Sequence, residues 1–212
     1  MSYYIGIKIN FKESSMSMPV ELREMIEQCG GTFTTAQANE VGISNERLRL
    51  LVRAGLLERA SFGVYVTPDT FIDKMYVAQL RRKRIIYSHE TALYLHDLTD
   101  RDPLNYSVTV PTGYNALMLH ADSFKVHAVK KELFKIGTVQ MQTVFGNTIT
   151  AYGLERTICD CMRNRNQMDL ALLTDAIKRY VSRPDKDLIT LMKMAETFKV
   201  SKPLQNYLEV LL

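Results

Sequence analysis

The stretch that decides the fold covers residues 34–66 and reads TTAQANEVGISNERLRLLVRAGLLERASFGVYV. Thr34 stands three residues before Gln37, which is the spacing of a capping box, so the sequence predicts a short helix. Gly42 ends that helix near residue 41. An earlier helix is predicted over residues 19–29, because proline at a first-turn position precedes an apolar stripe that two glycines interrupt.

A third helix and a hairpin complete this stretch. Ser44 can cap a helix through residue 54, and Gly55 stands where a left-handed residue commonly ends a helix. Two short strands are predicted at residues 56–60 and 64–67, around a turn at residues 61–63. Three helices followed by a hairpin are typical of a winged helix-turn-helix, a DNA-binding fold.

The third helix separates an apolar face from a basic one. At about 100° per residue, the core-facing positions are Ser44, Leu48, Leu51 and Val52. The opposite arc and its flanks hold Asn45, Glu46, Arg47, Arg49, Leu50 and Arg53. This third helix of the domain is the second helix of the helix-turn-helix motif, where a basic face favours contact with the DNA major groove. The alternative is that it is a solvated Arg/Glu helix in a domain that serves only packing.

The composition favours a folded protein without special chemistry. The chain has 212 residues, of which 46% are hydrophobic and 24% are charged, with a net charge of +4. Extensive disorder is excluded by these values. Three cysteines are too few for a disulfide framework and are read as reduced thiols. The two long charge-free stretches contain too many polar residues for lipid burial, and the first residues lack a signal-peptide pattern, so we expect a cytoplasmic location.

The remaining chain predicts an α+β protein: the winged helix-turn-helix, then a mixed α/β region, then a helical segment. We expect an arm at residues 1–17 with a short strand at 3–9, a DNA-binding domain at 18–68 and an α+β domain at 69–212. In that last domain the predicted helices are 69–80, 88–98, 154–162, 168–181, 188–198 and 203–212. The predicted strands are 85–87, 106–110, 124–129, 139–144 and 148–152.

A search for catalytic or metal-binding patterns finds none. His89 and Glu90 suggest a zinc protease, but Leu93 occupies the position of the second histidine, and His96 comes three residues later. Asp97, Asp100 and Asp102 could suggest a two-carboxylate metal site, yet no phosphate-cradling turn precedes them. We therefore expect no enzyme activity, no metal and no cofactor.

Several motifs resemble those of the AbiEi-type antitoxins of type IV toxin-antitoxin systems, which act in abortive phage infection. They are GLLER at 55–59, GVY at 63–65, SHETALYLHDL at 88–98, VTVP at 108–111 and LERTICD at 154–160. The resemblance implies a winged helix that represses its own operon by binding inverted repeats in the promoter. It also implies a C-terminal domain that counters a nucleotidyltransferase toxin without a stable complex, and it leaves self-association on DNA open.

The resemblance also assigns positions in this chain. The DNA-binding positions that it implies are Asn45, Glu46, Arg49, Arg53 and Arg59, and the helical wheel adds Arg47 beside them. The wing turn reads Ser-Phe-Gly at 61–63 and lacks the basic residue often found there, so Phe62 is expected to pack rather than to touch phosphate. The motif positions of the C-terminal domain are Ser88, Glu90, Thr91, Arg156 and Asp160.

Local structure offers a competing role for the C-terminal motif, with Ser88 as a helix cap and Arg156 and Asp160 as an ion pair four residues apart. Two functions from different classes therefore remain. One is a repressor and antitoxin without enzyme activity; the alternative is a metal-dependent nuclease or nucleotidyltransferase that a winged helix delivers to DNA.

Overall fold

The computed structural model describes residues 17–211, and the expected strand at residues 3–9 lies outside them. Contacts divide the chain into two compact units, Met1–Ile72 and Asp73–Leu212, whereas the sequence placed the border between residues 68 and 69. Helices and strands occur in both units, and the fold class is α+β as predicted. Among the described residues, no helix is both long and apolar enough to cross a membrane.

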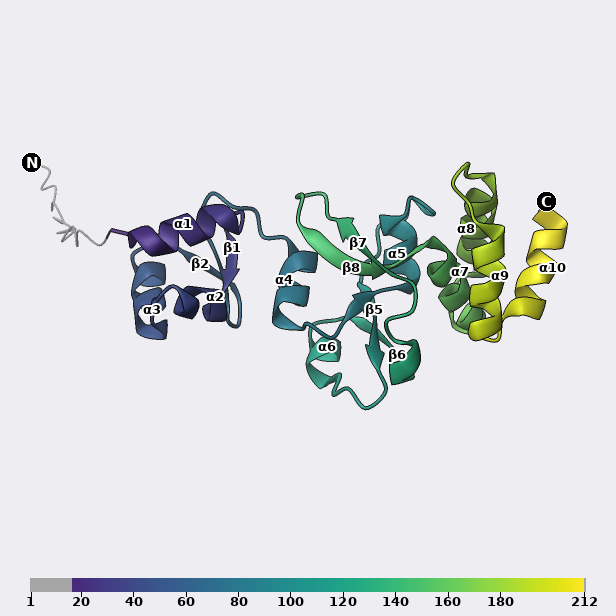
Figure 1. Cartoon of the computed structure of the whole chain (residues 1–212), viewed down its shortest axis with the longest axis horizontal. Helices are drawn as coiled ribbons and strands as arrows, with labels where there is room; N and C mark the ends of the chain where they lie inside the picture. Colours follow the sequence, from purple (N-terminus) through teal and green to yellow (C-terminus); the bar gives the residue numbers. More distant parts are fainter. Residues whose placement is uncertain (1–16, 212) are drawn as a thin grey trace, which may run out of the picture. The chain divides into compact units, whose positions relative to one another are not determined.

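The first unit is a winged helix-turn-helix (Figure 1). Its elements are α1 (Val20–Gln28), β1 (Thr32–Thr34), α2 (Thr35–Glu40), α3 (Asn45–Arg53), β2 (Glu58–Ser61) and β3 (Val64–Val66). The three strands form an antiparallel sheet in the order β1-β3-β2. The sequence predicted the three helices and the hairpin, and β1 is an addition to the expected elements.

Local sequence explains the turn between α2 and α3. The predicted capping box is present, because the Thr34 amide donates to Gln37 Oε1 at 2.8 Å and the Gln37 amide donates to Thr34 Oγ1 at 3.3 Å. Gly42 adopts a φ of 81°, and the Ile43 amide reaches back to the carbonyl of Ala38 at 2.9 Å. A left-handed residue at this position permits the tight reversal that sets the angle at which α3 leaves α2.

The second unit is built on a five-stranded mixed sheet in the order β6-β5-β4-β8-β7. The strands are β4 (Ile86–Tyr87), β5 (Ser107–Pro111), β6 (Lys125–Val129), β7 (Thr138–Gln142) and β8 (Thr148–Tyr152). The helices are α4 (Lys74–Arg81), α5 (His89–Leu95), α6 (Leu117–Ala121), α7 (Leu154–Arg163), α8 (Leu170–Ser182), α9 (Leu188–Thr197) and α10 (Ser201–Leu211), with short 3-10 turns at Lys131–Leu133 and Arg165–Gln167. The central strand β4 pairs antiparallel with β5 and parallel with β8.

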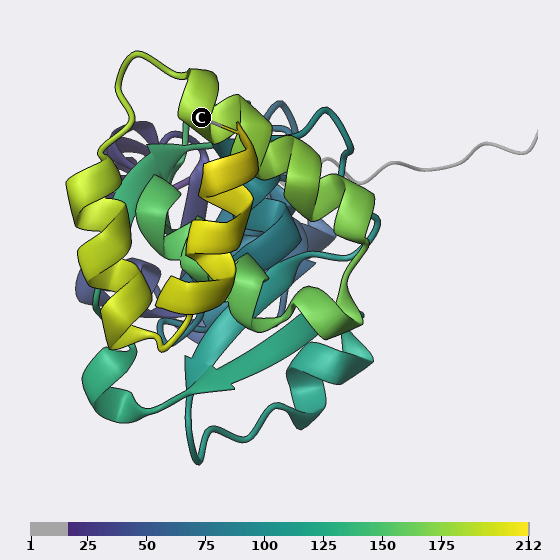
Figure 2. The ribbon, with the colours of Figure 1, turned by 90° about the vertical axis from the view of Figure 1, so that its right-hand side faces the viewer.

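Two hydrophobic cores lie in this unit. One core joins α4 and α6 to the sheet through residues such as Met75, Leu119 and Ile149. The other joins α5 to the four C-terminal helices, with Ile158 and Tyr180 fully buried in it. Figures 1 and 2 show α8, α9 and α10 gathered beside α7. The expected C-terminal helical segment is therefore present as α7 to α10, and it packs on α5.

The structure corrects the expected helix at 69–80, which begins five residues later, at Lys74. The carboxylate of Asp73 accepts the amides of Met75 and Tyr76 at 3.1 Å each, so Asp73 is the residue that starts α4. The same carboxylate accepts hydrogen bonds from Thr143 Oγ1 at 2.5 Å and from Asn147 Nδ2 at 2.9 Å. The short α6 was also missed, since five residues give too little periodicity to read.

Candidate functional site

Helix α3 begins at Asn45 and is capped by Ser44, whose hydroxyl accepts the amide of Arg47 at 3.2 Å. Leu48 and Leu51 are fully buried and Val52 is half-buried, as the helical wheel predicts. Ser44 itself is exposed rather than core-facing, because its side chain turns to the helix end to cap it. The apolar side of α3 thus fixes which residues point outward.

The outward side of α3 carries exposed polar and charged side chains, namely those of Asn45, Glu46, Arg49 and Arg53. Within residues 17–211, neither Arg49 nor Arg53 forms an ion pair or a side-chain hydrogen bond. Their guanidinium groups are therefore both solvated and uncompensated. Such groups can donate to phosphate oxygens or, in bidentate fashion, to a guanine edge.

The other two predicted DNA-binding arginines are held by the backbone. Arg47 Nη2 donates to the carbonyl of Ser17 at 3.2 Å, and Arg59 Nε donates to the carbonyl of Ser61 at 3.4 Å. The Arg59 guanidinium also lies 5.3 Å from the ring centre of Phe62, which is 75% exposed. The tip of the wing therefore presents an aromatic ring beside a cation, so Phe62 is not packed into a core.

In the second unit, the motif at the start of α5 ties that helix to strand β5. Ser88 makes no capping hydrogen bond, which corrects the expected cap; its hydroxyl instead accepts from Thr109 Oγ1 at 2.9 Å. Thr91 Oγ1 accepts the Ser107 amide at 2.7 Å, and Glu90 Oε2 accepts the Ser107 hydroxyl at 2.8 Å. The cap is lost because the buried hydroxyl of Ser88 is turned toward the sheet.

The predicted ion pair of α7 is present and buried. Arg156 Nε donates to Asp160 Oδ2 at 2.9 Å, and the two side chains are 1% and 5% exposed. The Arg156 guanidinium lies 4.0 Å from the ring centre of Tyr152 and 3.9 Å from that of Phe198. Its position between two rings adds cation–π attraction to the ion pair.

Backbone carbonyls complete the surroundings of Arg156. Its Nη1 donates to the carbonyls of Leu133 and Ile136, at 3.0 and 2.8 Å. Gly137 adopts a φ of 72°, and a Cβ added to it would stand 2.8 Å from Arg156 Cβ. Glycine makes this close approach feasible because it has no side chain to clash. Burial raises the pKa of Asp160, and the neighbouring Arg156 charge opposes that rise.

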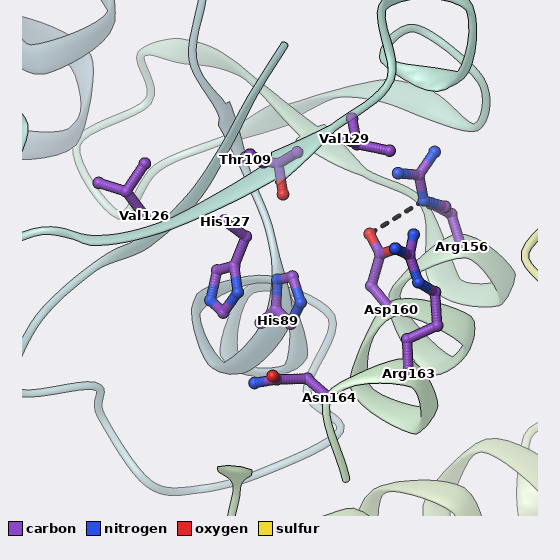
Figure 3. A pocket seen from close by; sticks show the side chains of 10 residues that line it. His89, Thr109, Val126, His127, Val129, Arg156, Asp160, Arg163 and Asn164 are labelled. Carbon is purple, nitrogen blue, oxygen red and sulfur yellow. Dashed lines mark hydrogen bonds and ion pairs between the residues drawn. The ribbon is translucent and has the colours of Figure 1, made fainter. Parts of the chain in front are cut away.

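A cavity of about 290 Å³ lies next to this ion pair. Its polar lining comes from α5, β5, β6 and α7 with its C-cap, and consists of His89, Thr109, His127, Arg156, Asp160, Arg163 and Asn164 (Figure 3). The rings of His89 and His127 stack with their centres 3.5 Å apart and their planes 14° apart. His89 adopts a φ of 49°. That backbone conformation is unfavourable for a residue with a Cβ.

Burial lowers the pKa of both stacked histidines below the ordinary value of 6.5, so both rings are neutral at pH 7. Sequence reasoning rejected His89 as part of a zinc site and did not single out Thr109, His127 or Arg163. No local signal could have found them, because they come from different elements and meet only when the sheet and α7 are in place.

Comparisons with known proteins bear on both units. A family model described as "Transcriptional regulator, AbiEi antitoxin" matches residues 21–68, and this confirms the resemblance over the winged helix-turn-helix. No curated protein sequence matches the chain. The crystal structure of the RV2827C protein from Mycobacterium tuberculosis matches with a TM-score of 0.55 and 13% identity, covering 85% of this chain and 72% of that one. At that identity the likeness concerns the fold alone.

Proposed function

We propose, from the match of residues 21–68 to the AbiEi antitoxin regulators, that this chain represses its own operon and is the antitoxin of a type IV toxin-antitoxin system. Its first unit would bind double-stranded DNA at inverted repeats in that promoter. Its second unit would counter a nucleotidyltransferase toxin in the cytoplasm, without forming a stable complex with it. Neither role requires an enzyme activity, a metal or a cofactor.

One observation carries the DNA-binding part of the proposal. The matched segment contains α3, whose outward side presents Arg49 and Arg53 without ion-pair partners in residues 17–211. With α3 in the major groove, Asn45 and Glu46 in its first turn would face base edges, the usual position of such contacts in a recognition helix. Arg59 on the wing would lie over the adjacent backbone. Inverted repeats would then bring two copies of the chain to one operator.

The test is fluorescence anisotropy with the DNA upstream of the chain's own gene, at several salt concentrations. We expect Arg49→Ala and Arg53→Ala each to weaken binding by about 1–3 kcal/mol if the arginine reads a base. An arginine that contacts phosphate instead would reduce the logarithmic salt slope by roughly 0.9 when it is removed. Both variants should stay folded, since both side chains are exposed.

A matched control removes the same charge elsewhere. Lys178→Ala and Lys193→Ala take away two exposed cations of the second unit, on α8 and α9, and should leave promoter binding unchanged. Promoter binding that survives in the folded Arg49→Ala, Arg53→Ala double variant would refute the assignment of α3 as the recognition helix.

Co-expression tests the antitoxin part. A nucleotidyltransferase encoded next to this chain should stop growth when expressed alone and should be tolerated when the chain is present. Gel filtration of the two proteins together should give two separate peaks, as expected for neutralisation without a stable complex. Unrelieved toxicity would contradict the antitoxin role even if promoter binding is found.

The alternative of a DNA-delivered nuclease or nucleotidyltransferase makes the opposite prediction for metal. Its carboxylates would have to bind Mg²⁺, and calorimetric titration of the full chain with MgCl₂ would then release or absorb heat. Asp100, a candidate for such a role by sequence, is held by both terminal nitrogens of Arg179, at 3.0 and 2.5 Å. We therefore expect no saturable Mg²⁺ binding.

A further inference from the structure

A second cavity adjoins the one beside Arg156 in the second unit. It has a volume of about 520 Å³, and the two cavities share Ala128, Val129 and Arg163 in their walls. We call them together the paired cavities. Their combined volume is in the range of small-molecule sites in proteins.

The walls of the paired cavities are strongly basic. Lys130, Arg163, Arg165 and Lys199 line the second cavity, and none of them forms an ion pair within residues 17–211. Among the described lining residues, Asp160 is the one carboxylate, and its charge is already matched by Arg156. The positive charge of the walls is therefore uncompensated, and its natural counterpart is an anion.

Two buried polar atoms without hydrogen-bond partners also indicate that a ligand binds in the first cavity, and this evidence does not depend on the charge of the walls. In the described part of the chain, the buried side-chain nitrogens and oxygens without a hydrogen-bond partner are Arg156 Nη2 and His127 Nε2. Both belong to residues that line the first cavity, and Arg156 is 1% exposed. A buried polar group without a partner costs free energy, so native proteins keep few of them, often at sites that take up a water or an ion.

We propose that the paired cavities bind a small phosphorylated molecule, with Arg163, Lys130 and Lys199 engaging its phosphate groups. Arg163 stands in the wall common to both cavities, where it can reach a ligand in either one. The neutral His89 and His127 pair supplies flat, uncharged surface beside it, against which the rest of the molecule can lie (Figure 3). Phosphate is favoured over carboxylate because several separate cations converge on one site.

The motif of α5 and α7 acts on this site indirectly. Ser88 and Thr109 join α5 to β5 through their hydroxyls, and this contact holds His89 in its strained conformation next to His127. The Arg156–Asp160 pair fixes the wall of α7 in the same way. These residues are positioning residues, and the proposal rests on neither DNA binding nor antitoxin activity.

The experiment is calorimetry on the full chain, without divalent metal, using inorganic phosphate, pyrophosphate, ATP and CTP in turn. We expect saturable binding that strengthens from phosphate to pyrophosphate or to a nucleoside triphosphate. Arg163→Gln, and separately the pair Lys130→Gln with Lys199→Gln, should each weaken it roughly tenfold or more, the effect of losing charge-assisted hydrogen bonds. These three side chains are exposed, so the variants should keep the fold, which circular dichroism checks.

Two controls separate this site from other basic surfaces. Lys178→Gln with Lys193→Gln removes the same charge outside the paired cavities and should change the affinity less than about twofold. Arg49→Ala with Arg53→Ala removes the exposed arginines of α3 and should leave binding of the small anions intact. A chain that does not bind the promoter could therefore still bind the small anions. A chain that does not bind the small anions could likewise still bind the promoter.

Three outcomes would overturn the proposal. The first is no binding of any of the four probes at millimolar concentration. The second is binding that the Lys178 and Lys193 control reduces as much as the Lys130→Gln, Lys199→Gln pair does. The third is binding of a short single-stranded RNA, but of none of the small probes, which would assign the basic walls to a polynucleotide instead.

Discussion

Helices α3 and α7 carry arginines in opposite surroundings, and the contrast separates two uses of the same residue. On α3, Arg49 and Arg53 stand four residues apart, exposed and without ion-pair partners in residues 17–211. On α7, Arg156 is buried between two aromatic rings and bound to Asp160 and two carbonyls. An exposed arginine contributes little to stability and is available to a partner, whereas a buried one is tied to the fold that surrounds it.

The largest effect we expect is an all-or-none division of labour between the units. A fragment of residues 69–212, which keeps the Asp73 cap of α4, should fold, should fail to bind the promoter and should still protect cells from the toxin. Circular dichroism, anisotropy and co-expression measure the three properties. If the folded fragment gives no protection while the full chain with Arg49→Ala and Arg53→Ala does protect, the first unit contributes more than DNA binding.

The next largest effect concerns the buried arginine. Arg156→Ala leaves the Asp160 carboxylate buried without its cation, so the free energy of unfolding of the second unit should fall by about 3–5 kcal/mol. Urea unfolding followed by circular dichroism measures the loss. Arg163 lies on the same helix and is exposed. Its replacement by alanine should change the unfolding free energy by roughly 0.5 kcal/mol at most, as is usual for surface positions. Equal losses of unfolding free energy in Arg156→Ala and Arg163→Ala would show that burial does not distinguish the two arginines.

Acid should destabilise only the second unit, because all four histidines of the chain lie in it. Burial lowers the pKa of His89, His96 and His127 below 6.5 in the folded unit. Near and below pH 6.5 the unfolded chain therefore binds more protons at these histidines than the folded unit does. Its unfolding free energy should therefore fall as the pH drops below about 6.5, by up to about 1.4 kcal/mol per pH unit for each histidine. Asp160 acts in the opposite direction, since its pKa is raised.

Urea unfolding at pH 7.5, 6.5 and 5.5 measures this dependence. His127→Gln should reduce the pH dependence of the unfolding free energy of the second unit by the contribution of one histidine. The urea midpoint of the first unit should stay constant between pH 7.5 and 5.5. A pH dependence of equal size in both units would show that the buried imidazoles are not its source.

The smallest effect sharpens the description of α3. Ser44→Ala removes the hydroxyl that accepts the Arg47 amide and should destabilise the first unit by about 1 kcal/mol. Ser44→Gly should cost only a few tenths of a kcal/mol, because glycine is tolerated at the cap. Thermal unfolding of the two variants side by side measures the difference, and a larger loss for glycine than for alanine would argue against a capping role.

The first unit could be predicted closely from the sequence because its signals are local. Helix ends are marked by residues only a few positions apart from the helix, namely Thr34 with Gln37, and Ser44 with Gly55. The helical wheel correctly predicted that Leu48 and Leu51 are buried. Among the core-facing positions of the wheel, only Ser44 was wrong. A helical wheel assumes that each side chain points straight outward, whereas the Ser44 side chain turns back to the backbone to cap the helix. The start of α4 was predicted wrongly, and there the deciding partners Thr143 and Asn147 lie some seventy residues further on.

The paired cavities could not be predicted for the same reason. His127 lies within the predicted strand 124–129 and Arg163 directly follows the predicted helix 154–162, and nothing in either local pattern marks the residue. Their significance depends on the β5–β6 pairing and on how α7 packs beside α5. The Arg156–Asp160 pair was predictable because both members sit on one helix, but its burial was not.

The position of β4 at the centre of the second sheet has a consequence for synthesis on the ribosome. The nascent chain makes β4 at residues 86–87, but its parallel partner β8 comes at residues 148–152, so one side of β4 stays open while some sixty residues are added. The strands that the structure describes in the first unit, by contrast, all lie between residues 32 and 66. A chain that stops between these points would display a finished winged helix-turn-helix joined to an unpaired strand edge, the kind of surface that recruits chaperones or aggregates.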